Sequence, residues 1–453
     1  MTKNLKNFQK IVFFVALFML IPLWNIPHTI AGRYACEGIL LISIFFFKPE
    51  WRLFFAKNKL LVAFFVYLIL QLIFFSKNYS VAFSNFRAEW MHFILFSIIG
   101  AGTGLILGKI DSRKILLYLG IAFSVPLYIH LALSLIKGIS IGAIPWGYWG
   151  INLIHGDFAY SALQAIILFC AFYLLQSQTK GERSFTIVLI AICIASPLLA
   201  KSRGGVGFAL ISALFVVISY FIFDTQNRIS MKTKLLFLAS IPVLILGIYK
   251  IGMISDANRW DGILSRISIG FEGNPGKVYC EGIETLKEKI QGKGIEITPS
   301  IQKGLDSVVD GDGARVMAAR AGSMLALQNP MGIDQSKQAF QQAITHYCDS
   351  APKIFISHTH DGWIDTSLAI GIPGAILLLL VLINYAKLGY TSVLKRSSSS
   401  PYCVALFASA CMWILRGVMD STMRDQMLEI QAFIFALLAG IILVQDKLGS
   451  KTK

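Results

Sequence analysis

The feature that most constrains this chain is a series of apolar segments that recur along almost its whole length. A helix of about 20 apolar residues spans the hydrocarbon core of a bilayer. Only 15% of the 453 residues are charged, whereas a soluble protein of this size carries charge on about a quarter of its residues. The sequence therefore predicts an all-α, polytopic membrane protein.

The apolar segments predict about twelve transmembrane helices. The expected spans cover residues 11–30, 34–47, 60–76, 91–108, 115–136, 152–176, 184–200, 205–223, 235–252, 364–386, 402–418 and 428–446. The second span is short. The edges of the spans near Pro145 and Pro197 stay open, because proline interrupts a helix.

The distribution of lysine and arginine predicts the orientation in the membrane. Loops rich in these residues alternate with loops that carry few, and cytoplasmic loops hold the excess. This pattern places both termini in the cytoplasm. The net charge of +16 could suggest nucleic acid, but positive-inside bias and anionic membrane lipids account for it in a chain this apolar, so we expect no nucleic-acid partner.

One long polar segment interrupts the apolar pattern. It divides the chain into an N-terminal bundle with nine spans (1–252), a loop (253–363) and a C-terminal region with three spans (364–453). The charge pattern puts this loop on the outer side of the membrane, and the family resemblance described below implies the periplasm. Apolar spacing predicts helices over 281–291 and 314–328, and Asn329-Pro330 ends the second, so the loop is expected to be mainly helical.

Cys280 and Cys348 are the two cysteines inside this loop. An exported loop lies in an oxidising compartment, so we expect them to form a disulfide. Closing a loop of that length would stabilise the fold by roughly 4 kcal/mol in the chain-entropy model. The alternative is a pair of unpaired thiols.

Arginines at the ends of the spans that face away from the cytoplasm are the first candidates for binding an anionic substrate. Lys201-Ser202-Arg203-Gly204-Gly205 lies between the seventh and eighth spans, and a guanidinium fork fits phosphate oxygens. The alternative is an arginine that reaches toward lipid headgroups. Arg315 begins a helix of small residues, and Arg320, five positions on, points to another face. For these two, the alternatives are solvent exposure or an ion pair with Asp310 or Asp312.

His358-Thr-His360-Asp361 precedes the tenth span, with Thr359 or Asp361 as the expected N-cap. The positive end of a helix dipole favours a neutral imidazole, which can act as a general base near pH 7. The alternative is a polar residue that marks a helix start. Gly and Trp occupy positions 362 and 363, where a metallo-hydrolase motif would need Asp and His, so we expect no metal.

In this order, the motifs resemble the O-antigen ligase and polymerase superfamily of bacterial cell-surface glycan assembly. The resemblance covers roughly residues 150–450. The matching residues are Ser202-Arg203-Gly204, Arg315 before Asn329-Pro330-Met-Gly332, and His360 with Trp363-Ile364 before Ala369-Ile-Gly371-Ile-Pro373-Gly374. Within the superfamily the chain looks most like the lipopolysaccharide O-antigen ligases, and Arg416-Gly-Val-Met-Asp420 and Arg424 add to that likeness. Asp361 stands where the family usually has Asn, and Ala319 stands where many polymerases have Trp.

The resemblance implies a glycosyltransferase without metal or cofactor. It implies undecaprenyl-diphosphate-linked O-antigen as donor and lipid A–core oligosaccharide as acceptor. Arg203 and Arg315 would neutralise the diphosphate leaving group, and His360 would deprotonate or orient the acceptor hydroxyl for an inverting displacement. Further substrate contacts are expected from Lys201, Arg320, His358, Asp361, Arg416, Asp420 and Arg424.

Three other functions remain open at this point. An O-antigen polymerase and a protein O-oligosaccharyltransferase would use the same type of donor. A transporter or flippase for the lipid-linked glycan belongs to a different class, and transporters usually place charges in the middle of the membrane.

Overall fold

The computed structural model describes residues 3–24, 26, 28–110, 114–149, 155–175, 179–223, single positions between 230 and 254, 263–394 and 400–451. In these ranges the regular structure is helical, without β-strands. Seven of the described helices are long and apolar enough to cross a membrane, or eight if α3 and α4 form one bent span. The predicted all-α membrane architecture is therefore confirmed, while twelve spans remain a prediction.

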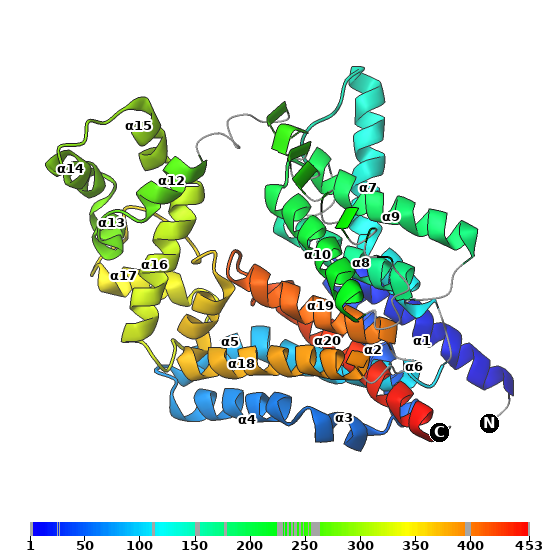
Figure 1. Cartoon of the computed structure of the whole chain (residues 1–453). Helices are drawn as coiled ribbons and strands as arrows, with labels where there is room; N and C mark the ends of the chain where they lie inside the picture. Colours follow the sequence, from blue (N-terminus) through cyan, green and yellow to red (C-terminus); the bar gives the residue numbers. More distant parts are fainter. Residues whose placement is uncertain are drawn as a thin grey trace.

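The helices fall into two groups (Figure 1). The apolar bundle contains α1 (Lys3–Leu23), α2 (Ile30–Phe47), α3 (Trp51–Lys57), α4 (Lys59–Phe74), α5 (Tyr79–Asn85), the π-helical turn η1 (Phe86–Trp90), α6 (Met91–Leu107), α7 (Ile115–Ile141), α8 (His155–Leu175), α9 (Lys180–Leu199), α10 (Arg203–Phe223), α18 (Gly362–Leu394), α19 (Ser400–Gly417) and α20 (Asp425–Lys451). The second group contains α12 (Ile263–Gly270), α13 (Pro275–Glu281), α14 (Glu284–Gly292), α15 (Pro299–Asp306), α16 (Asp312–Gln328) and α17 (Ala339–Tyr347). Each expected span overlaps helical residues; of the span 235–252 the structure describes ten positions, all of them helical.

The centre of the bundle is the pair α6 and α20. Among the described helix pairs they pack most extensively, and in the most apolar 18-residue stretch of α20 94% of the residues are buried. A Cβ atom on Gly100 or Gly104 would lie 2.3 or 2.1 Å from a carbonyl oxygen of α20. Glycine at these positions therefore lets the two backbones approach as closely as small residues allow in membrane proteins.

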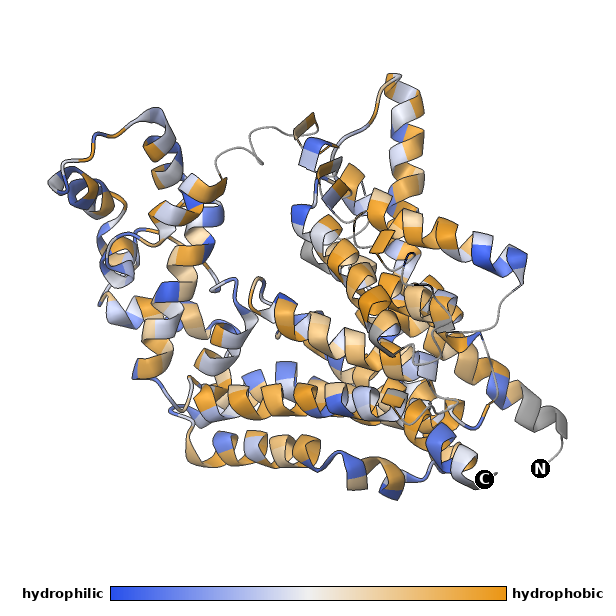
Figure 2. Ribbon diagram, viewed as in Figure 1, coloured by the Kyte–Doolittle hydropathy of each residue, from blue (hydrophilic) through white to orange (hydrophobic). Residues whose placement is uncertain are grey.

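The second group, α12–α17, has a hydrophobic core of its own. Met317 and Leu325 of α16 pack there with Leu286 of α14 and Phe340 of α17. Hydrophilic residues are mixed through this group, whereas the bundle helices are mainly hydrophobic (Figure 2). A disulfide between Cys280 and Cys348 joins the end of α13 to the end of α17.

The two helices expected in this segment differ in how well they match the structure. The expected helix over 314–328 is present as α16, which begins at Asp312 and is capped at its end by Asn329. The helix expected over 281–291 is present as α14, which begins three residues later at Glu284 and follows the separate helix α13. Gly282 separates them with φ of 93°, a left-handed conformation that glycine adopts without a steric penalty.

The two groups are joined where α18 breaks. Gly371 has φ of 85°, so this helix is two helical segments and not the continuous span expected from the sequence. The turn after α16 fills the break, because Ile333 N donates to Leu368 O at 2.7 Å and Ile372 N donates to Pro330 O at 2.9 Å. A Cβ atom on Gly332 would lie 2.5 Å from the Gly371 nitrogen. These glycine motifs therefore connect α16 to the bundle.

The two chain termini lie together at the end of the bundle away from α12–α17 (Figure 1). α18 and α20 run from the region of α12–α17 toward that end. The molecule thus has one end that carries the second helical group and an opposite end that carries both termini.

Candidate functional site

Three segments that are distant in sequence meet where α12–α17 contacts the bundle. They are α16, the loop 357–361 before α18, and the loop 418–424 between α19 and α20. The two loops are tied together because Gly362 N donates to Asp420 O at 3.1 Å and Ser421 Oγ donates to Asp365 Oδ2 at 2.6 Å. Arg315 of α16 is close enough to both loops to affect the pKa values of His360 and Asp420.

The loop 357–361 is fixed by its own polar side chains. Asp361 Oδ1 accepts from the backbone N–H groups of Trp363 and Ile364 at 2.9 and 3.0 Å, which makes Asp361 the N-cap of α18. Thr359 N donates to Asp365 Oδ1 at 2.9 Å. His360 has φ of 58°, a conformation that is uncommon for a residue with a side chain and is held here by the hydrogen bonds on either side.

His358 and His360 lie side by side, with 4.2 Å between their ring centroids. His358 Nδ1 also shares a hydrogen bond of 2.7 Å with Ser357 Oγ. Burial, and then the charge of Arg424, lowers the pKa of His358 to about 4. Burial, and then His358 and Arg315, lowers the pKa of His360 to about 4. Both imidazoles are therefore neutral at pH 7, as expected for His360, but burial is the main cause.

Asp420 provides the negative charge opposite these groups. Burial raises the pKa of this carboxyl, but Arg416 and Arg315 outweigh that effect and hold it below its usual range. Arg416 Nη2 lies 3.4 Å from Asp420 Oδ2. The Arg416 guanidinium also stacks on the Tyr160 ring of α8 at 4.0 Å and on the Phe208 ring of α10 at 4.7 Å.

Two arginines of this loop have N–H groups that are buried without a partner in the described part of the chain. Arg416 is only 2% exposed, yet its Nε and Nη1 atoms make no hydrogen bond there. Arg424 Nε donates to Asp425 Oδ2 at 3.1 Å, while its Nη1 atom has no acceptor. Buried donors of this kind are costly to leave unpaired and are suited to an anionic oxygen from a ligand.

Arg315 is exposed on α16. Among the described residues, its guanidinium forms no ion pair and no hydrogen bond, so its charge is available to a ligand. The ion pair with Asp312 that the sequence allowed does not form. Asp312 instead pairs with Arg203 and Arg266.

Arg203 begins α10 and contacts α16 through Asp312. Arg203 Nη2 lies 3.0 Å from Asp312 Oδ1, and Arg266 Nη2 of α12 lies 3.1 Å from Asp312 Oδ2. One carboxylate thus holds two guanidinium groups, one from the bundle and one from α12. The Arg203 side chain is 30% exposed.

Arg320 makes contacts within the protein, and Lys201 lies in a turn at the start of α10. Arg320 donates to the carbonyl oxygens of Gly270, Glu272 and Gly273 at 3.0, 3.1 and 2.9 Å, so it holds the end of α12. Lys201 has φ of 56° in the turn between α9 and α10, and its backbone N–H donates to Leu198 O at 3.1 Å.

Sequence reasoning missed the roles of Arg266 and Asp365. Arg266 lies in a short amphipathic helix with no motif to distinguish it from the other charges of the loop. Asp365 carried a weak signal, because an acidic residue inside a predicted span is costly unless it has a partner. Here it accepts hydrogen bonds from Thr359 and Ser421, which fixes one loop against the other.

Within the described ranges, no three His, Cys, Asp or Glu side chains are grouped so that they could hold a metal ion. No protein-family model matches the chain, and no curated protein is detectably similar to it. The functional argument therefore rests on the geometry above and on the motif resemblance.

Proposed function

We propose that this protein is a membrane glycosyltransferase that moves an O-antigen glycan from undecaprenyl diphosphate to the lipid A–core oligosaccharide. One observation carries the proposal. An unpaired arginine (Arg315), two neutral imidazoles (His358 and His360) and an ionised carboxylate (Asp420) meet at one end of an apolar bundle, although they come from three separate segments.

The arrangement supports a direct displacement at the anomeric carbon. The acceptor hydroxyl oxygen forms a bond to that carbon, and the bond from the carbon to the diphosphate oxygen breaks. Arg315, assisted by Arg203 and by the unpaired N–H groups of Arg416 and Arg424, stabilises the negative charge that develops on the leaving diphosphate. Displacement in one step inverts the configuration at that carbon.

His360 takes the acceptor proton in this scheme. An imidazole with a pKa of about 4 is a weak base in the free protein. The bound diphosphate brings negative charge to the neighbouring Arg315, which removes one cause of the low pKa and makes the imidazole more basic. Binding of the glycan donor therefore makes His360 a stronger base. His358 packs against His360 and holds its ring.

We place the protein in the bacterial inner membrane, with about twelve spans, α12–α17 in the periplasm and both termini in the cytoplasm. Two observations support this orientation. Lysine and arginine are concentrated in alternate loops, and both termini lie at the end of the molecule away from α12–α17 (Figure 1).

The positions of three charged residues that meet within the bundle weigh against a transporter. Arg33 of α2 and His92 of α6 both lie 3.4 Å from Glu429 of α20. All three residues fall in the first two turns of their helices, at the end that carries the candidate site. A substrate path across the membrane would instead place charges near its middle.

Deletion of the gene, followed by gel analysis of the lipopolysaccharide, tests the proposal. We expect core without an O-antigen ladder, and polymer that stays on the lipid carrier. A core capped with one repeat unit would show a polymerase instead. An unchanged ladder would contradict both and would point to glycosylation of protein. Complementation with the wild-type gene and with His360→Ala separates loss of the protein from loss of its chemistry.

A further inference from the structure

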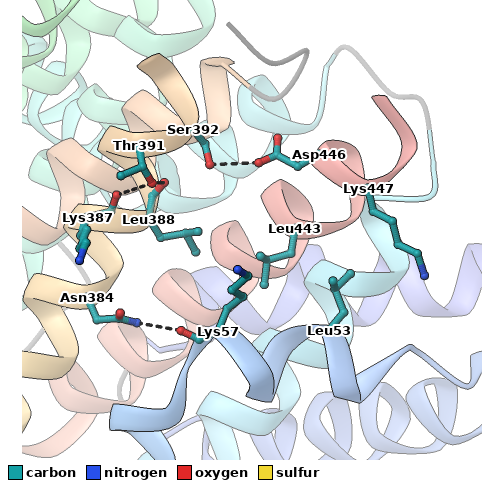
Figure 3. Close-up of a pocket in the computed structure, with 10 residues that line it drawn as sticks. All are labelled: Leu53, Lys57, Asn384, Lys387, Leu388, Thr391, Ser392, Leu443, Asp446 and Lys447. Carbon is teal, nitrogen blue, oxygen red and sulfur yellow. Dashed lines mark hydrogen bonds between the residues drawn. The ribbon is translucent and has the colours of Figure 1, made fainter. Parts of the chain in front are cut away.

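A cavity of about 540 Å³ lies at the end of the bundle away from the candidate site. The end of α3 and the C-terminal parts of α18 and α20 surround it (Figure 3). Three lysines line it, one from each helix: Lys57, Lys387 and Lys447. The glycan site uses none of these residues.

Two of the three lysines are available to an anion. Lys447 forms an ion pair with Glu50 at the rim. The ammonium groups of Lys57 and Lys387 form no ion pair or hydrogen bond within the described ranges. In Figure 3 the Lys57 side chain extends from α3 into the space between α18 and α20.

The polar residues around the cavity hold its walls together. Asn384 Nδ2 donates to the backbone oxygen of Lys57 at 3.3 Å, which joins α18 to α3. Ser392 Oγ donates to Asp446 Oδ2 at 3.0 Å, which joins α18 to α20. The cavity is therefore bounded by helices that are hydrogen-bonded to each other, so its lysines are held in a defined arrangement.

The remaining wall of the cavity is apolar. Leu53, Leu388 and Leu443 line it beside the lysines. On α18, Leu380 and Ile383 are 41% and 45% exposed and continue the apolar surface along the helix. A soluble anion has no apolar part to contact such a wall. In a phospholipid the phosphate lies next to the acyl chains, so a phospholipid fits both the lysines and the leucines.

The shape of α3 places the cavity at the level of lipid headgroups. α3 and α4 meet at an angle of 82°, so α3 turns away from the direction of α4. Its sequence combines aromatic and basic residues, with Trp51 stacked on Phe55 at 5.8 Å and Lys57 at its end. This composition is typical of short helices at a membrane interface.

We propose that this cavity binds the headgroup of an anionic phospholipid. Lys57 and Lys387 contact its phosphate, and the leucine wall contacts the first methylene groups of its acyl chains. Positive-inside bias accounts for lysines at this end of the bundle. It does not account for two lysines without ion pairs that line a bounded cavity beside a leucine wall, which is the arrangement of basic headgroup sites between membrane helices.

The test measures lipid binding to the purified full-length protein in detergent. Phosphatidylglycerol, phosphatidylcholine and inorganic phosphate are titrated separately, and the unfolding temperature is followed. We expect phosphatidylglycerol to raise it and the other two to have little effect. Each lysine near an anionic lipid contributes about a fivefold change in affinity. Lys57→Gln with Lys387→Gln should therefore weaken phosphatidylglycerol binding by about 25-fold.

A matched control replaces two lysines elsewhere, Lys109→Gln with Lys180→Gln, and should leave the affinity unchanged. Lys57→Arg with Lys387→Arg keeps the charge and should retain binding, which separates lost contacts from misfolding. Equal weakening by the two glutamine pairs would show attraction by overall charge and would overturn the site. A rise in unfolding temperature with inorganic phosphate alone, equal to that with lipid, would also overturn the lipid assignment.

Discussion

Arg203 and Arg315 were expected to do the same work, but the structure gives them different surroundings. Arg203 stands on a helix of the bundle and is paired with Asp312, which also binds Arg266. Arg315 lies on α16, one turn after Asp312, and is exposed. In the described part of the molecule its guanidinium has no counter-ion, and its charge lowers the pKa of His360.

The two arginines therefore differ in how much positive charge each can present to an anionic ligand. A guanidinium that shares a carboxylate is partly neutralised, so an anionic ligand must compete with Asp312 for it. An unpaired guanidinium offers its full charge. Arg315 is therefore expected to be the main contact for the diphosphate. Arg203 is expected to make a smaller contribution, because Asp312 must release it before it can bind the diphosphate.

Replacement of Arg315 tests the difference between the two arginines, and it is expected to have the largest effect. Arg315→Ala should lower glycan transfer in reconstituted membranes by about 10³-fold, because the variant loses the guanidinium that stabilises the negative charge developing on the leaving diphosphate. Arg315→Lys should restore little, since an ammonium cannot make bidentate contacts.

Arg320→Ala is the matched control, because this arginine lies on the same helix but is bonded to three carbonyl oxygens. It should lower the unfolding temperature and leave transfer per folded protein nearly unchanged. If Arg320→Ala removes as much activity as Arg315→Ala, the distinction between these two arginines is wrong.

Replacement of Arg203 and of its partner should give intermediate effects. Arg203→Ala is expected to lower transfer by about 10²-fold. Asp312→Asn frees Arg203 and Arg266 from their shared carboxylate, so it should tighten donor binding while costing about 1–3 kcal/mol of stability through the weakened ion pairs.

The measurements are donor binding and thermal unfolding of the same purified variants. Weaker donor binding in Asp312→Asn would show that the ion pair positions Arg203 for the substrate and does not compete with it. A larger loss of transfer in Arg203→Ala than in Arg315→Ala would reverse the comparison.

The pH dependence of stability also distinguishes Arg315 from Arg203, and its expected effect is the smallest of those predicted. The pKa of His360 is about 4 in the folded protein, below the ordinary 6.5 of the unfolded chain. The unfolded state therefore binds more protons between these values, and stability should fall as the pH drops from 6.5 toward 4. Arg315→Ala removes one cause of the low pKa, so its stability should fall less steeply across this window.

Arg203 is not among the main charges that act on His360, so Arg203→Ala should stay close to the wild-type slope. Unfolding temperatures measured between pH 4 and pH 7.5 give the slopes for the three proteins. Identical slopes in wild type and Arg315→Ala would mean that Arg315 does not act on the imidazoles.

Local sequence predicted most of the helices because their causes are local. The apolar segments correspond to helices wherever the structure describes them, and the helix over 314–328 ends at Asn329, as expected. Asp361 was one of two expected caps for α18, and it accepts both N–H groups that a cap should accept. These features depend on residues within a few positions of each other.

Other features had no local signal. The break in α18 at Gly371 depends on the turn at Gly332, almost forty residues earlier, whose backbone hydrogen bonds replace those missing from the helix. The glycine-containing motifs were visible, but their role in joining α16 to the bundle was not. Likewise, Arg266 became part of the site only because α12 packs on α16.

By itself, the sequence determined that this chain is a helical membrane protein, because burying that much apolar surface in water-free surroundings leaves helices as the solution for its backbone hydrogen bonds. It also determined which charged residues lie at helix ends. Only the tertiary structure decided which of those charges are paired. Asp312 could have paired with Arg315 or Arg320, and the packing of α10 and α12 against α16 gave it Arg203 and Arg266 instead. Ion pairs form between side chains that folding brings within a few ångströms, and that proximity is a property of the packed helices.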